Sequence, residues 1–91
     1  MIRLNVFVRV NETNREKAIE AAKELTACSL KEEGCIAYDT FESSTRRDVF
    51  MICETWQNAE VLAANEKSAH FAQYVGIIQE LAEMKLEKFE F

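Results

Sequence analysis

The chain has 91 residues, of which 48% are hydrophobic and 30% charged, and its formal net charge at pH 7 is −5. This length suits one small domain over residues 1–91, with the composition of a globular protein and not of a disordered one. The Lys and Arg residues are scattered, whereas a nucleic-acid site needs clustered cations. No apolar run approaches the roughly 20 residues that span a bilayer, so neither nucleic acid nor membrane is an expected partner.

The cysteines indicate a reducing compartment. Cys28, Cys35 and Cys53 are odd in number and lack a Cys-x-x-Cys spacing, which argues against a disulfide framework and against a zinc site. The first ten residues lack the apolar core of a signal peptide. We therefore expect reduced thiols and a cytoplasmic protein.

The first half of the chain predicts a strand followed by a helix. Residues 2–10 alternate between hydrophobic and polar side chains, which is typical of a half-buried strand. Thr13 and Glu16 have the spacing of a capping box, so a helix is predicted from there to about Glu33. Gly34 is expected to end this helix in the left-handed conformation.

The second half predicts two strands, two helices and a last strand. Residues 35–42 and 48–56 are the predicted strands, and a polar turn joins them. Asn58 is the predicted N-cap of a short helix, and Ser68 that of a longer one. Residues 84–91 alternate again and close the chain as a strand.

The predicted order β-α-β-β-α-β is typical of a ferredoxin-like α+β sandwich with a four-stranded antiparallel sheet. Both helices then cover one face of the sheet, and the first and third strands lie in its middle. The third strand is nevertheless apolar on both faces: Val49, Met51 and Cys53 on one, Phe50, Ile52 and Trp56 on the other. We therefore expect a homodimer that pairs sheet to sheet as a dimeric α+β barrel; the alternative is a monomer with an exposed apolar face.

Three segments resemble the antibiotic-biosynthesis-monooxygenase (ABM) family, in order and over essentially the whole chain. They are residues 31–38, with the sequence Lys-Glu-Glu-Gly-Cys-Ile-Ala-Tyr, residues 54–56, Glu-Thr-Trp, and residues 68–71, Ser-Ala-His-Phe. The resemblance implies a dimeric α+β barrel with a pocket between the sheet and the helices of each subunit. The family includes cofactor-independent oxygenases of phenols and quinols, haem-degrading enzymes, and sugar-phosphate isomerases.

Three positions depart from the family pattern. Asn65 stands where many relatives carry a further histidine, and Ala69 replaces the usual proline. Val75 stands where the haem-degrading branch places its ligand histidine, so the resemblance disfavours haem.

His70 is the candidate catalytic residue because it is the only histidine. With Ser68 as N-cap, His70 lies in the first turn of its helix, where the helix dipole favours a neutral ring. Such a ring could take a proton from an acidic phenol or polarise a carbonyl. Tyr74 lies four residues on, on the same helical face, and is a candidate substrate-binding residue. The alternative is that His70 is simply a partly exposed polar residue.

Trp56, Asn5 and Asn65 are the other candidate substrate-binding residues. Trp56 is core by default, but the resemblance implies an aromatic wall for a flat substrate. Asn5 and Asn65 could each orient a ligand oxygen, although Asn5 could equally face solvent or a partner subunit.

Glu54 shares a strand face with Trp56, and a buried carboxylate should be paired or functional. We expect an ion pair with Arg3 or Arg9 on the first strand, in preference to a catalytic base. Tyr38 is expected to pack in the core or the dimer.

No glycine-rich phosphate loop signals a flavin or nicotinamide cofactor, and one histidine with scattered acids predicts no metal site. The expected function is therefore a cofactor-independent monooxygenase of a phenolic or quinol-like small molecule. Two alternatives stay open. One is an isomerase or other proton-transfer enzyme of a small sugar-phosphate-like signal molecule, and the other is a non-catalytic dimeric module that binds a small molecule.

Overall fold

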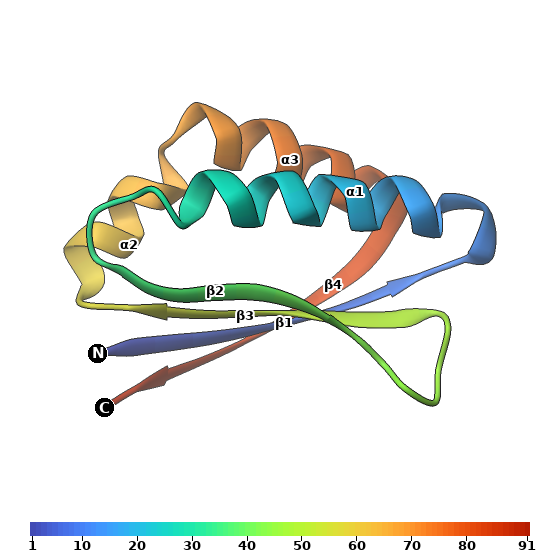
Figure 1. Cartoon of the computed structure of the whole chain (residues 1–91), viewed down its shortest axis with the longest axis horizontal. Coiled ribbons are helices and arrows are strands. Elements are labelled where there is room, and N and C mark those ends of the chain that lie inside the picture. The colour runs from blue at the N-terminus through green and yellow to red at the C-terminus, as the bar shows by residue number, and fades with distance from the viewer.

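A computed structural model describes all residues, 1–91, and has four strands and three helices in two layers (Figure 1). The elements follow in the order β1 (Ile2–Val10), α1 (Glu12–Ser29), β2 (Cys35–Glu42), β3 (Val49–Trp56), α2 (Ala59–Glu66), α3 (Ala69–Leu81) and β4 (Ala82–Glu90). None of the helices has the length and apolar character that crossing a membrane requires.

The four strands form one antiparallel sheet in the order β2-β3-β1-β4. Helices α1 and α3 lie over one face of this sheet, with α2 at one end (Figure 1). The predicted ferredoxin-like α+β fold is therefore confirmed, including the central position of the first and third strands.

The core lies between the sheet and the helices. Alternate residues of β1, from Ile2 to Val10, are buried against the helices, as the period-two pattern predicts. Val8 pairs with Phe50 and Val6 with Ile52 across the β1–β3 ladder, so these two strands face the helix layer together.

Helix α1 begins and ends earlier than the sequence suggested. Its N-cap is Asn11, whose side chain accepts a hydrogen bond from the backbone N–H of Asn14 at 2.9 Å, so the capping box at Thr13 is wrong. An Asn at this position satisfies the orphan N–H as well as a threonine would. The helix ends at Ser29, and residues 30–34 form turns. Gly34 has the expected left-handed conformation, with φ of 82°, but it precedes β2 and does not cap the helix.

Both later caps are confirmed. The side chain of Asn58 accepts from the N–H of Val61 at 3.0 Å, and that of Ser68 accepts from the N–H of Phe71 at 3.2 Å. The Ser68 hydroxyl also donates to the backbone oxygen of Asn65 at 2.6 Å, which fixes the junction between α2 and α3.

The sheet face turned away from the helices has no cover within the chain, and we call it the open face. Phe41, Met51 and Phe7 form a row across β2, β3 and β1 on this face. Phe7 is 39% exposed and Phe41 52%, and Phe89 on β4 is 49% exposed. Exposed apolar residues of this size on neighbouring strands are typical of an interaction surface.

Candidate functional site

A cavity of about 210 Å³ lies between the helix-covered face of the sheet and the three helices. Its hydrophobic wall consists of Leu4, Val6, Leu25, Tyr38, Ile52, Leu62, Phe71, Val75, Met84 and Leu86. The remaining lining residues are Glu54, Glu66 and Gln79, so no Lys, Arg or His faces the cavity. A cavity of roughly 150 Å³ holds a benzene ring, so this one has room for a substituted aromatic ring.

Helix α2 supplies part of the cavity wall because Gly34 allows it to approach the sheet. A Cβ atom at Gly34 would lie 2.6 Å from Cγ1 of Val61, on the first turn of α2. The Gly34 carbonyl also accepts a hydrogen bond from the N–H of Gln57 at 2.9 Å, just before the helix. The turn before β2 therefore sets where Leu62 and Glu66 lie.

Glu54 is the most buried polar group of the cavity, with 7% of its surface exposed. It lies near the end of β3, where strand alternation turns it toward the helices with Trp56. The indole Nε1 of Trp56 donates a hydrogen bond to Glu54 Oε1 at 2.9 Å. No Lys or Arg forms an ion pair with this carboxyl.

Burial raises the pKa of Glu54 to about 7 because desolvation penalises the charged form. Hydrogen bonding from Trp56 and Tyr38 opposes this rise, and the negative charge of Glu66 adds to it. The carboxyl can therefore both hold and release a proton near neutral pH, which is the property of a general acid or base.

The predicted ion pair of Glu54 with Arg3 or Arg9 is wrong. Both arginines lie on the open face, because they are the odd-numbered residues of β1, while Glu54 pairs with the even-numbered Leu4. Arg3 donates from Nε to Asn5 Oδ1 at 3.1 Å, and Arg9 forms an ion pair with Glu83 at 2.7 Å. The sheet itself separates these cations from the carboxyl.

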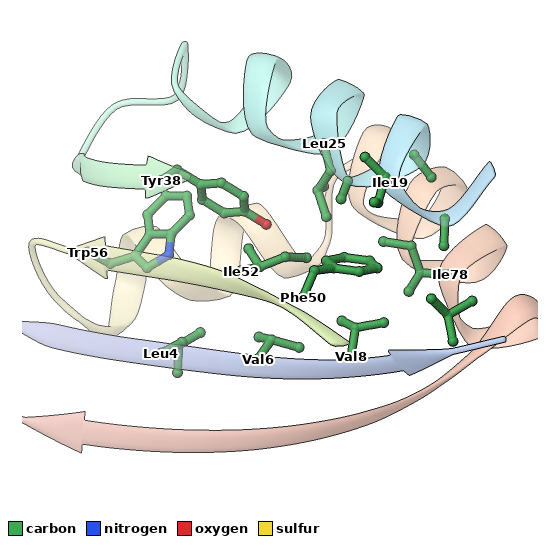
Figure 2. Close-up of a cluster of buried hydrophobic side chains, with 14 of the residues drawn as sticks. Leu4, Val6, Val8, Ile19, Leu25, Tyr38, Phe50, Ile52, Trp56 and Ile78 are labelled. Atoms are coloured by element: carbon green, nitrogen blue, oxygen red, sulfur yellow. The ribbon is translucent and has the colours of Figure 1, made fainter. Parts of the chain in front are cut away.

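Tyr38 and Trp56 frame Glu54 at one end of the cavity. Their rings meet edge to face, with centroids 6.3 Å apart and an interplanar angle of 84° (Figure 2). Trp56 is fully buried and does not line the cavity itself, but it contacts Tyr38 and donates a hydrogen bond to Glu54, which both do. Burial and the nearby Glu54 raise the pKa of Tyr38, so its hydroxyl stays protonated and can donate a hydrogen bond in the cavity.

His70 and Asn65 meet at the junction of the three helices, outside the cavity lining. His70 Nε2 lies 3.2 Å from Glu32 Oε1, but the two atoms are not aligned for a hydrogen bond. Asn65 Nδ2 donates to Glu32 Oε2 at 2.6 Å and to Ser29 Oγ at 3.3 Å. The next residue after His70, Phe71, does line the cavity, so His70 stands one residue from it.

Asn5 and Tyr74 lie away from the cavity as well. Asn5 is on the open face, on the opposite side of the sheet. Tyr74 lines a groove between α1 and α3, beside Glu24 and Ile77. The five residues predicted from the sequence therefore do not form one site. Trp56 is hydrogen-bonded to Glu54 at the cavity, His70 and Asn65 lie at the helix junction, Tyr74 lies in the α1–α3 groove, and Asn5 lies on the open face. Their functional roles stay predictions.

None of the 13 residues that line the cavity was assigned to a site from the sequence, and this includes the buried Glu54 and Tyr38. The sequence did contain a signal for Glu54. It shares a strand face with Trp56, whereas Arg3 and Arg9 share the polar face of β1. No comparable signal marked Tyr38, because Phe41 on the same strand was an equally good candidate for the buried face. The structure contains no group of three or more His, Cys, Asp or Glu residues that could hold a metal ion.

Comparison with known proteins gives consistent results. A family model described as antibiotic biosynthesis monooxygenase matches residues 1–76. The chain is 30% identical over 87 residues to YcnE of Bacillus subtilis (strain 168), which is named as a candidate monooxygenase; the match covers 96% of this chain and 92% of YcnE.

Solved structures share the fold. A conserved protein of unknown function from Bacteroides thetaiotaomicron VPI-5482 is 98% identical, with a TM-score of 0.98 over 99% of this chain and 96% of that one. A variant of SnoaB from Streptomyces nogalater, a cofactor-independent oxygenase, is 8% identical, with a TM-score of 0.88 over 99% of this chain and 91% of SnoaB. At that identity the likeness concerns the fold alone.

Proposed function

Because the chain belongs to the antibiotic biosynthesis monooxygenase family, we propose that it is a cofactor-independent monooxygenase of a phenolic or quinol-like small molecule. The observation that carries the proposal is the cavity of about 210 Å³, apolar except for three side chains, with the buried carboxyl of Glu54 in its wall. An apolar cavity with few polar groups is the usual form of a small-molecule site.

The reaction would need no electron donor other than the substrate. Oxidation of a phenol to a quinone by dioxygen releases four electrons; one oxygen atom enters the ring and the other leaves as water. The protein's part is to bind the phenol, favour its ionised form and exclude water, for which an apolar cavity with a proton acceptor is suited.

The cavity argues against the alternative of a phosphorylated sugar as substrate. Glu54 and Glu66 line it and no cation does, so a phosphate would meet negative charge in an apolar surrounding. Proton transfer on a neutral carbonyl compound remains compatible with Glu54 and is the second candidate function.

The proposal includes a homodimer through the open face and a cytoplasmic location. Phe7, Phe41 and Phe89 are exposed there, and a second copy would remove them from water. The odd number of cysteines without metal-site spacing supports a reducing compartment. Residues 1–91 would act as one domain in each subunit.

Oxygen uptake by the purified protein tests the proposed function. The protein would be assayed without flavin or nicotinamide, with a metal chelator, against single-ring and polycyclic phenols and quinols. We expect uptake with at least one single-ring compound. It should be lost in Val75→Trp, which fills the cavity, and kept in Ile77→Trp on the outer side of the same helix. A folded protein without uptake across the panel would contradict the proposal and favour the second candidate.

The same assay tests the catalytic role that the sequence predicts for His70. If His70 is the base, the His70→Ala variant loses uptake; full uptake in that variant removes His70 from the chemistry.

A further inference from the structure

We propose that Glu54 is the catalytic proton acceptor of the cavity, and that the ligand it serves is an uncharged, single-ring hydroxyl compound. This inference rests on the proposed function for the identity of the site, and it names the residue and the ligand class that the site would use.

The placement of Glu54 indicates that its carboxyl serves a ligand. A carboxyl with 7% exposure on a central strand costs stability unless it is paired, and no cation pairs with it. Trp56 donates the one side-chain hydrogen bond of regular geometry that Glu54 receives. Oε1 of Glu54 satisfies the indole N–H of the buried Trp56, whereas no group of the protein donates a hydrogen bond of regular geometry to Oε2, so this second oxygen is available to a ligand in the cavity.

The charge of the cavity lining favours an uncharged ligand. An anionic ligand would enter beside Glu54 and Glu66 without a Lys, Arg or His to compensate it. A neutral ligand meets no such cost, and a ligand hydroxyl supplies the hydrogen-bond donor that a carboxylate lacks. The volume of about 210 Å³ is larger than the roughly 150 Å³ that holds a benzene ring, so a single substituted ring fits the cavity.

The proton-transfer step keeps the charge of the cavity constant. The ligand O–H bond breaks, a new O–H bond forms on the Glu54 carboxylate, and the electron pair stays on the ligand oxygen. Glu54 and the ligand together carry one negative charge before and after the step. Afterwards the protonated Glu54 and the Tyr38 hydroxyl can both donate hydrogen bonds to the ligand oxyanion, which stabilises the charge where it has developed.

The test uses 4-nitrophenol, whose absorption band differs between the neutral and the ionised form, and it requires no turnover. We expect the wild-type protein to bind the probe at pH 7, where part of Glu54 is ionised, and to show more of the ionised band than the free probe does at the same pH. Glu54→Gln should bind the probe with the ionised band reduced by about tenfold or more, since a general base is removed. Glu80→Gln, on the exposed side of α3 and outside the cavity lining, should resemble the wild type.

The ligand class is tested with 4-nitrophenyl phosphate, which should bind at least about tenfold more weakly than 4-nitrophenol. Equal binding of the phosphate ester, an undiminished ionised band in Glu54→Gln, or no binding of 4-nitrophenol to the wild type would each overturn the inference. Circular dichroism of Glu54→Gln confirms that the variant is folded. Because the probe reports ionisation without oxygen uptake, failure of this inference and failure of the monooxygenase proposal are separate results.

Discussion

Glu54 links the chemistry of the cavity to the stability of the fold. Its pKa of about 7 in the folded protein lies above the ordinary value of 4.5, so between these pH values the folded state holds a proton that the unfolded chain has released. The free energy of unfolding should therefore fall as the pH rises from 4.5 to 7, and level off above 7, by on the order of 3 kcal/mol in total. Tyr38, Glu66 and Cys35 are the other titratable groups near this carboxyl.

Urea unfolding of the Glu54→Gln variant across this pH range measures the contribution of the carboxyl. Gln does not titrate, so this variant should lose that part of the pH dependence. Its free energy of unfolding should fall less between pH 4.5 and pH 7 than that of the wild type. Glu80→Gln serves as the control, because Glu80 is exposed on α3 and does not contribute to the pKa of Glu54. An unchanged pH slope in Glu54→Gln would show that Glu54 has an ordinary pKa.

At the scale of the elements, the turn before β2 positions α2 against the sheet, and Gly34 is the residue that allows it. Gly34→Ala would force a side chain into a φ of 82° and place its Cβ 2.6 Å from Val61 Cγ1. We expect the free energy of unfolding to fall by about 2 kcal/mol or more in urea denaturation. Because α2 carries Leu62 and Glu66, affinity for a cavity ligand should fall as well.

The chain contains a matched control for this change. Gly76 lies inside α3, and apart from its chain neighbours and the backbone of its own helix nothing lies within 4 Å of the position that its Cβ would take. Gly76→Ala should therefore stabilise the protein by about 0.5–1 kcal/mol through the higher helix propensity of alanine. If both variants changed stability alike, the close approach at Gly34 would not be the cause.

At the scale of the whole molecule, the open face should hold two copies together. Phe7 sits in the middle of this face, beside Met51, and Phe7→Lys would place a charge at the centre of the contact. A stable interface buries about 800 Å² per partner, and a charge at its centre opposes that burial. In sedimentation equilibrium we therefore expect the wild type as a dimer and Phe7→Lys as a monomer. Ile77→Lys, on the helix side, should stay dimeric; a monomeric wild type would contradict the proposed assembly.

Much of this fold could be predicted from short-range patterns, because strand alternation and N-caps are local. Asn58 and Ser68 cap the helices as predicted. The start of α1 was misplaced because Asn11 and Thr13 are both good N-caps two residues apart. The surroundings of Glu54 depend on which strands are neighbours and which faces they share, and this is long-range information. The predicted ion pair with Arg3 or Arg9 was wrong because it considered only the opposite charges and not the faces of the strands.

We place the chemistry in the cavity at Glu54, and kcat for oxygen uptake in Glu54→Gln, measured beside that of His70→Ala, tests this placement. With a single-ring phenol that the wild type oxidises, we expect Glu54→Gln to lower kcat by roughly a hundredfold or more, as for loss of a general base. His70→Ala, which alters a residue outside the cavity lining, should keep kcat near the wild-type value. Full activity in Glu54→Gln together with its loss in His70→Ala would contradict this account and place the base at the helix junction.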